Sequence, residues 1–332
     1  MSTLGLQKSK PGAERMFSAS RVILLVLLII AIVLPPFLSP YYLYLLTTIM
    51  MTALLAASLN FVLGYGGLLQ LHHAVFFGVG AYTVALVLTK TSWPFWTAVI
   101  AAPIVAGFFA LLIGWFCVRL RGLYFGMLTL ALGQLVWAVV YKWRSLTGGD
   151  DGIHAIPVPD YLASPTSVYY VNLAVLVISL IILYVIVKSP FGLTLVATRD
   201  NPVRSQSVGV NIRRHQLAAF VLAGFFAGVS GVLFVLIEQS VSPSLLYWSK
   251  SAEILIMCLL GGMAVFMGPT LGAAVLVILS MVVGTYIDYW LLVLGLVLLL
   301  LVLFLPQGVL GFLQEKLSGR KTGEGGERDA AS

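Results

Sequence analysis

The sequence of 332 residues carries little charge: Asp, Glu, Lys and Arg make up 9% of it, against about 25% in an average soluble domain. Hydrophobic residues make up 60% and occur in long runs such as 23–34 and 290–305. A soluble fold could not bury this much apolar surface, and the runs lack the alternation that membrane β-strands need. The composition therefore indicates an all-α polytopic membrane protein, in which each spanning helix needs about 20 apolar residues.

Cysteine is almost absent: Cys117 and Cys258 both lie in apolar runs, without the spacing of metal ligands. We expect both to be packing residues and predict no metal site. The sequence also lacks a Walker A motif, so it should not bind ATP through a P-loop. It contains no GxSxG, HExxH or CxxC motif. We therefore expect no catalytic residue, no cofactor and no enzymatic activity.

Acidic residues inside the apolar runs are scarce. Carriers driven by protons or sodium usually keep carboxylates there, because an ionisable group within the membrane is costly and tends to be functional. Glu238 and Asp288 lie at the ends of apolar runs, which leaves Glu253 as the one serious candidate for an interior acid. This scarcity argues against an ion-coupled carrier and fits a translocator that is driven from outside the membrane.

About ten apolar segments are candidates for transmembrane helices. The third and eighth are short and rich in glycine, so we expect broken or re-entrant helices there, covered by protein or by a water-filled cavity. The ranges are roughly 21–38, 42–63, 72–89, 95–118, 122–142, 168–187, 214–237, 251–267, 270–287 and 289–305.

The distribution of cations predicts the orientation of these spans. With the N-terminus in the cytoplasm, 15 of the 19 Lys and Arg residues fall in cytoplasmic segments and the remaining 4 fall outside. Such a bias is typical of membrane proteins, and it puts both termini in the cytoplasm. We expect an N-terminal cytoplasmic tail at 1–20 and a disordered cytoplasmic tail at 314–332, where hydrophobic residues are few. The net charge of +7 follows from this topology and does not indicate nucleic-acid binding.

One long polar segment, VATRDNPVRSQSVGVNIRRHQ, separates the sixth and seventh predicted spans. Asp200 and Asn201 are good N-cap residues, Pro202 suits the first position of a helix, and Gly209 is a typical C-terminal stop. The pattern predicts a turn at SPFG, a turn or two of helix at LTLVATR, and a short capped helix at about 202–208. We therefore expect a structured cytoplasmic segment over about 190–213.

Two further local patterns concern packing. Gly224, Gly228 and Gly231 recur at intervals of three or four residues and predict the close approach of another helix backbone. His72 and His73 lie beside an apolar run, and on a helix their side chains would diverge by about 100°. Since they could not easily share one site, we expect helix-end or pore-lining positions rather than metal binding.

The sequence GLTLVATRDNPVRSQSVGVNIRRHQLAAFVLAGFFAGVSGVL resembles the cytoplasmic coupling segment of ABC importer permeases. Four more stretches are similar to the branched-chain amino acid permease family, whose members are usually paired with a second, related permease. They are LNFVLGYGGLLQLHHAVFFGVGAY, LRGLYFGMLTLALGQLVWAVVYKWRSLTGGDDGI, LLGGMAVFMGPTLGA and LFLPQGVLGFL. The resemblance covers about residues 20–313 and implies an importer permease domain at 21–313.

The resemblance implies a multi-pass protein of the bacterial cytoplasmic (inner) membrane, surrounded by membrane lipid. In this family two permease chains form the pathway, two cytoplasmic ABC ATPases supply the power stroke, and a periplasmic binding protein delivers the substrate. The segment that docks on the ATPase corresponds here to Arg199, Asp200, Asn201, Pro202, Arg204 and Gly209. Relatives often carry an acid- and alanine-rich run where this chain reads NPVRSQS, and Ser-Leu-Gly-His where it reads QLHH.

Polar residues in or beside the spans are candidates for the substrate path, because a desolvated polar group needs a partner. They are Asn60, Gln70, His72, Thr129 and Gln134, and each could equally bond one helix to another. Asp150 and Asp151, in the predicted outer loop, either meet the binding protein or form a turn. The expected function is ATP-driven import of branched-chain or other small amino acids. The alternatives are urea or short amides as substrates of the same importer class, a stand-alone secondary transporter and, ranked lowest, a membrane-embedded enzyme.

Overall fold

The structure is a computed structural model that describes residues 28–286, 292 and 295. The predicted tails at 1–20 and 314–332, part of the first span and all but two residues of the tenth lie outside the described residues. Within the described part of the chain the regular structure is helical, without a β-strand, and one isolated bridge pairs Ile153 with Val241. The chain is therefore an all-α polytopic protein, as predicted from its composition.

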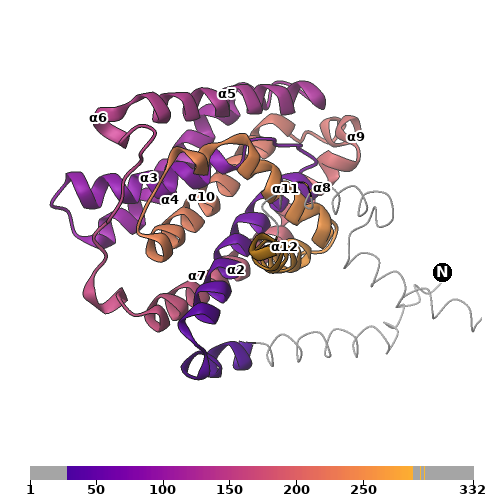
Figure 1. Cartoon of the computed structure of the whole chain (residues 1–332). Helices are drawn as coiled ribbons and strands as arrows, with labels where there is room; N and C mark the ends of the chain where they lie inside the picture. The colour runs from indigo at the N-terminus through magenta and orange to yellow at the C-terminus, as the bar shows by residue number, and fades with distance from the viewer. Residues whose placement is uncertain (1–27, 287–291, 293–294, 296–332) are drawn as a thin grey trace, which may run out of the picture.

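Five described helices are long and apolar enough to cross a membrane. Each coincides with a predicted span to within a few residues, because hydropathy and length alone identify such segments. They are α2 (Pro40–Asn60), which continues into the π-helical turn η2 (Phe61–Tyr65), α4 (Phe95–Cys117), α5 (Leu123–Lys142), α7 (Pro165–Lys188) and α10 (Ile212–Glu238). In Figure 1, α5 lies along the top of the molecule, and α3, α4 and α10 lie beneath it.

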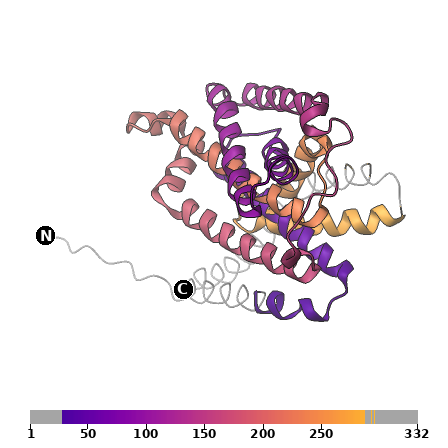
Figure 2. The same ribbon diagram turned by 90° about the vertical axis from the view of Figure 1, so that its left-hand side faces the viewer.

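The third and eighth predicted spans are short helices interrupted by irregular backbone. They are α3 (Ala74–Lys90), of 17 residues, and α11 (Trp248–Gly261), of 14 residues. Residues 66–73 precede α3 without helical structure, and His73 is the N-cap of α3. The expected helix-end position of the two histidines is confirmed, and the helix starts two residues after the predicted boundary. The ninth span is α12 (Gly268–Tyr286), which extends to one side of the molecule in light orange in Figure 2.

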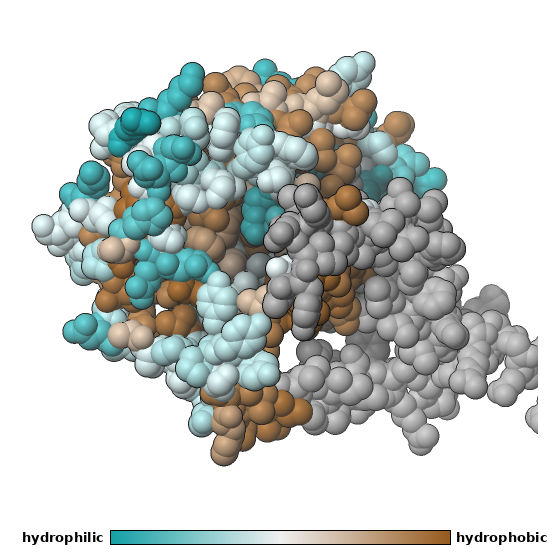
Figure 3. Space-filling model, viewed as in Figure 1, coloured by the Kyte–Doolittle hydropathy of each residue, from teal (hydrophilic) through white to brown (hydrophobic). Residues whose placement is uncertain are grey.

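Short elements connect the long helices. They are η1 (Pro35–Phe37), α6 (Arg144–Thr147), η3 (Asp160–Leu162), α8 (Pro190–Asp200), α9 (Pro202–Ser207) and η4 (Pro243–Leu246). We call the end of the bundle where α4 and α7 end and α5 and α10 begin the inner end, because the cation distribution predicts that it faces the cytoplasm. The opposite end is the outer end. Polar side chains gather toward the two ends, and apolar side chains cover much of the surface over α5 (Figure 3).

Helices α3, α4 and α10 form the centre of the hydrophobic core and pack through small residues. Gly228 of α10 lies against the Ala106 side chain of α4, and Gly231 lies against the backbone of Phe77 and Ala81 in α3. A Cβ atom at either glycine would overlap these atoms. The close helix approach predicted from the glycine spacing is therefore confirmed.

Residues that were expected to serve packing do so. Cys117 and Cys258 are buried and free, and the Cys258 Sγ lies 3.2 Å from the carbonyl oxygen of Ala56 in α2. Glu253, the candidate for an interior acid, has a side chain that is 15% exposed and forms an ion pair of 2.8 Å with Lys250. A carboxylate that is already neutralised by a neighbour one helical turn away gives no indication of an ion-coupling site.

Candidate functional site

The predicted cytoplasmic segment folds into two short helices, α8 and α9, joined at a proline. The Asn201 Oδ1 accepts a hydrogen bond of 2.9 Å from the Arg204 amide, which caps α9, and Pro202 is the first residue of that helix. Gly209 follows with φ of 86°, the left-handed conformation that ends many helices. The short helix, its Asn201 cap and its glycine stop are therefore confirmed, although α9 ends one residue before the predicted boundary.

The start of the segment differs from the prediction. The SPFG sequence was expected to form a turn, but the Ser189 Oγ accepts from the Gly192 amide at 3.5 Å and caps α8, whose first residue is Pro190. Asp200 does not cap α9; it is the last residue of α8 and forms an ion pair of 2.9 Å with Arg199. Pro202 explains the boundary, since proline favours an extended conformation in the residue before it.

The inner surface of α9 is exposed and carries both apolar and basic side chains. Val203 and Val208 are 70% and 74% exposed, and Arg204 between them is also exposed. The Arg199 guanidinium donates a hydrogen bond to the carbonyl oxygen of Gly64, at the end of η2. The two helices therefore stand at the inner end as a capped unit, attached to the glycine-rich segment that follows α2.

A second set of polar residues lies inside the bundle, where residues 69–73 cross α5. The Leu71 amide donates to the Thr129 Oγ1 at 3.4 Å, and the His72 ring packs against Gly133, where a Cβ would overlap it. Gln70, His72 and Thr129 are each 2% exposed. The structure thus brings two of the five substrate-path candidates, His72 and Thr129, together at one face of α5, with Gln70 in the adjoining segment.

His73 holds this segment in place, together with two residues that the sequence analysis did not single out, Ser58 and Ser251. The His73 ring contacts the Ser58 Oγ at 2.8 Å and the Gln70 Oε1 at 3.3 Å. The Ser251 Oγ of α11 accepts from the Ala74 amide at 3.0 Å, at the start of α3. No local pattern could have identified Ser58 or Ser251, because their partners lie 15 and 177 residues away.

Several buried polar atoms of the path candidates have no protein partner. Both ring nitrogens of His72 and the Asn60 Oδ1 are buried without a hydrogen bond, although the Asn60 Nδ2 donates to the Met263 carbonyl oxygen at 3.3 Å. Such a group typically destabilises a fold by about 1–3 kcal/mol, and these atoms lack a partner that the described residues could supply. Gln134, half-buried, lies beside Gly133 in the chain and outside this group.

The outer loop, residues 147–153, is built by backbone geometry. Gly148, Gly149 and Gly152 have φ of 78°, 63° and 75°, which L-residues rarely adopt. Two reciprocal hydrogen bonds of 2.9 Å join Ile153 to Val241, beyond the end of α10. Asp150 and Asp151 are exposed on this loop, without a side-chain ion pair among the described residues.

The described residues therefore combine long apolar helices, polar ends, a capped helical unit at one end and buried polar atoms inside. No group of three or more His, Cys, Asp or Glu side chains within them could hold a metal ion. Together these features define a polytopic helical membrane protein with a few buried polar groups in its hydrophobic core, a class that includes transport subunits.

Comparison with known proteins specifies this class further. The family model described as branched-chain amino acid transport system / permease component matches residues 41–302, and the chain belongs to this family. The permease LivM of Escherichia coli K12, from a high-affinity branched-chain amino acid transport system, is 30% identical over 306 residues, which cover 84% of this chain and 72% of LivM. LivM of Salmonella typhimurium is 30% identical over 305 residues, covering 83% and 72%.

More distant matches cover less of the chain or share less of the structure. A probable branched-chain amino acid permease LivH of Methanocaldococcus jannaschii is 32% identical over 75 residues, covering 22% of this chain and 24% of LivH. The alignment with PsaBC from Streptococcus pneumoniae, solved in complex with a Fab, covers 73% of this chain and 91% of the PsaBC chain. The sequence identity is 16% and the TM-score is 0.33. That TM-score is too low to define the fold.

Family membership fixes the coarse identity of the chain. It is the permease of an ABC importer, a multi-pass protein of the cytoplasmic membrane, and a transport subunit in a transporter that has partner permease and ATPase subunits.

Proposed function

We propose that this permease carries branched-chain or other small amino acids, delivered by a periplasmic binding protein, together with a second homologous permease and two cytoplasmic ABC ATPases. The observation that carries the proposal is the match to the family and to LivM over most of the chain. The buried polar atoms beside α5 support a path for a small polar solute.

The proposed coupling site is the surface of α9 with its two flanking joints. Val203 and Val208 offer apolar area, and Arg204 offers a cation to a groove on the ATPase. Arg199, paired with Asp200 and bonded to Gly64, connects this surface to the end of α2. A push on α9 therefore reaches the bundle through a capped helix and an anchored arginine, instead of being lost in a flexible loop.

The proposed substrate path follows the face of α5 that contacts residues 69–73. A zwitterionic amino acid presents a carboxylate and an ammonium group, and a neutral imidazole offers one donor and one acceptor. His72, with both ring nitrogens unpaired, suits such a solute, and Gln70 and Thr129 supply further polar atoms. Gln70 and His72 stand where relatives commonly have serine and glycine, so we assign to these two residues the selection among small solutes.

The outer loop is the proposed contact for the binding protein. Its exposed carboxylates, Asp150 and Asp151, are presented by a loop that the bridge to Val241 holds against the end of α10. Charged groups at the rim of an interface mainly affect the rate and specificity of association. The loop therefore offers a rigid acidic contact at the outer end.

The transport proposal is tested by uptake into proteoliposomes that contain the complete transporter and its binding protein. We expect uptake of leucine, isoleucine or valine that requires internal ATP and persists when an uncoupler collapses the proton gradient. Uptake that survives ATP depletion and stops with the uncoupler contradicts the ABC mechanism. Uptake of urea or a short amide in preference to all three amino acids contradicts the substrate.

The coupling site is tested with Gly209→Val and Arg204→Glu. Valine at a left-handed position introduces about 1–2 kcal/mol of local strain, and glutamate reverses the charge of the exposed face. We expect both variants to insert normally but to lose most transport and most substrate-stimulated ATP hydrolysis. Gln239→Val is the matched control, because Gln239 is also left-handed (φ 49°), exposed, and at the opposite end of α10. Normal transport and normal substrate-stimulated ATP hydrolysis in both variants would show that α9 is not the coupling site.

The path is tested with His72→Leu, against Thr83→Val as a control, because the half-buried Thr83 hydroxyl bonds to the Val79 carbonyl oxygen of its own helix. Since the His72 ring nitrogens have no protein partner, leucine should leave stability unchanged or raise it. Loss of one bond to the solute predicts a fall in uptake of about 5- to 100-fold. A loss of stability with unchanged uptake per folded molecule assigns His72 to the scaffold instead.

A further inference from the structure

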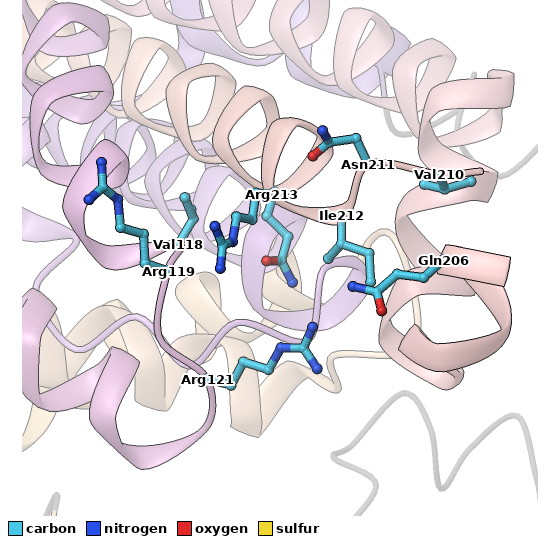
Figure 4. A pocket seen from close by; sticks show the side chains of 9 residues that line it. Val118, Arg119, Arg121, Gln206, Val210, Asn211, Ile212 and Arg213 are labelled. Carbon is cyan, nitrogen blue, oxygen red and sulfur yellow. The ribbon is translucent and has the colours of Figure 1, made fainter. Parts of the chain in front are cut away.

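A pocket opens at the inner end between the end of α4, the start of α10 and α9. It has a volume of about 320 Å³ and is shown in Figure 4. Arg119 lies at one side of it, Gln206 and Asn211 lie at the other, and Arg213 and Arg121 lie between them. A neighbouring pocket of about 300 Å³ shares Arg119, Asn211 and Arg213, so the two form one continuous depression.

The charge of this depression is uncompensated. Arg119, Arg121 and Arg213 line the first pocket, and Arg214 joins them in the second. No acidic residue lines either pocket, and none of these four arginines forms an ion pair within the described residues. Guanidinium groups carry only donors and bind phosphate oxygens in pairs. The depression is therefore complementary to an anion that has several oxygens, of which a phosphate group is the common biological form.

The second pocket continues into an apolar surface. Trp115, Val118 and Leu217 form its wall, and the Arg119 guanidinium lies over the Trp115 ring at 5.5 Å. Beyond Trp115, the exposed side of α4 is apolar along the span, with Leu112 46% and Phe108 55% exposed. The basic pocket is thus continuous with the apolar, exposed side of α4. This arrangement matches an amphiphile, which has both a charged group and an apolar chain, better than it matches a soluble anion.

We propose that this depression binds one anionic phospholipid of the inner leaflet. The phosphate lies among Arg119, Arg121 and Arg213, and an acyl chain follows Trp115 and Leu112 along α4. Basic pockets between transmembrane helices on the cytoplasmic side suit anionic headgroups. Because Gln206 of α9 lines the same pocket, the bound headgroup also touches the segment to which we assign coupling, although the lipid site does not depend on that assignment.

The arginines also contribute to the ordinary excess of cations at the inner end, so the test separates a built site from general charge. The full-length protein is purified in its complex, and phosphatidylglycerol binding is measured by native mass spectrometry, with phosphatidylcholine as the neutral reference. We expect one phosphatidylglycerol to be retained per chain. Arg119→Gln/Arg213→Gln should weaken its binding about 30-fold. Each cation near the membrane surface strengthens binding by a factor of about 5, and the two factors multiply.

The matched control is Lys90→Gln/Lys142→Gln, which removes two exposed cations at the outer end and should leave phosphatidylglycerol binding unchanged. If the arginine variant is not recovered, Trp115→Ala decides, because it keeps every cation. It should weaken phosphatidylglycerol binding several-fold and leave the binding of inorganic phosphate unaltered. Unchanged phosphatidylglycerol binding in Trp115→Ala, or in the arginine variant, overturns the proposal.

Two other outcomes also overturn it. If inorganic phosphate, at a concentration equal to that of the lipid, displaces phosphatidylglycerol, the depression is a site for soluble anions. An arginine variant that keeps its phosphatidylglycerol but no longer purifies with the ATPase identifies a protein contact.

Discussion

The outer loop and the α8–α9 unit lie at opposite ends of the same helix, α10, and are held by different means. The outer loop depends on main-chain geometry: left-handed glycines and the bridge between Ile153 and Val241. The inner unit depends on side-chain caps from Ser189, Asn201 and Asn211, each of which accepts from the amide three residues ahead. Backbone geometry of the first kind tolerates few sequences, whereas several residue types can cap a helix.

The inner unit also accommodates a proline between its two helices. Pro202 takes the first position of α9, where its missing amide hydrogen has no intrahelical partner to lose. The proline therefore separates α8 from α9 without bending either helix. A capped joint of this kind depends on few specific residues, whereas the glycines of the outer TGGDDGI sequence are required by their positive φ.

The largest effect is expected from a substitution that displaces α10, the helix that joins the two regions. Gly231→Val would put two methyl groups into the backbone of Phe77 and Ala81, which cannot rotate away as a side chain can. We expect destabilisation of about 3 kcal/mol or more, measured by equilibrium unfolding in mixed micelles. Ala218→Val, an exposed site on the same helix, should change stability by about 0.5 kcal/mol. Similar values for the two variants contradict the tight contact with α3.

A substitution in the outer loop should have the next largest effect. Gly152→Val requires a β-branched residue at φ of 75° and overlaps the Val241 carbonyl oxygen. We expect a local loss of about 2–3 kcal/mol, seen as faster hydrogen exchange at the Ile153 and Val241 amides. Asp151→Val places the same side chain one residue earlier, at an exposed position, and should leave exchange at those amides unchanged. Equal protection in both variants means that the bridge does not depend on the glycine.

Removing a cap at the inner end should have a smaller effect. Asn201→Ala deletes the acceptor for the Arg204 amide, and we expect α9 to lose about 1 kcal/mol. Hydrogen exchange at Arg204 should accelerate about fivefold, and coupled ATP hydrolysis should fall in parallel. Asn201→Asp keeps an acceptor and should retain both properties. Slow exchange in Asn201→Ala indicates that contacts other than the cap hold α9.

The smallest change in stability is expected from the two exposed carboxylates of the outer loop. Asp150→Asn/Asp151→Asn should alter the free energy of unfolding by less than about 0.5 kcal/mol. If the loop meets the binding protein through charge, the association rate should fall and lose its dependence on salt. If the association rate at low salt is unchanged, Asp150 and Asp151 form part of a turn and do not contact the binding protein.

The sequence predicts those parts of the structure that depend on neighbours along the chain. The long spans follow from hydropathy, and α9 follows from Asn201, Pro202 and Gly209 because a cap acts over three residues. The same reasoning, applied to Ser189 and Pro190, predicts the start of α8, which was instead interpreted as a turn. The N-cap rule was sufficient at Ser189 but was not applied there.

Other parts depend on contacts between distant residues and carry no local signal. Residues 66–73 are not helical and pack against Gly126, Thr129 and Gly133 of α5, so that α3 begins two residues after the predicted start. The bond from Arg199 to Gly64 and the bridge from Ile153 to Val241 likewise join remote segments. A single sequence shows which residues are polar within the membrane but not which of them meet.

The contact of α10 with its neighbours has a mechanical consequence. A helix of 27 residues is about 40 Å long, and the glycine contacts leave no space in which α3 or α4 could slip along it. The three helices then behave as a lever arm with the α9 surface near one end and the outer loop at the other. If α9 receives the proposed stroke, a tilt of about 5° would displace the far end of such an arm by about 3.5 Å, and the outer rim would move without any contribution from the solute.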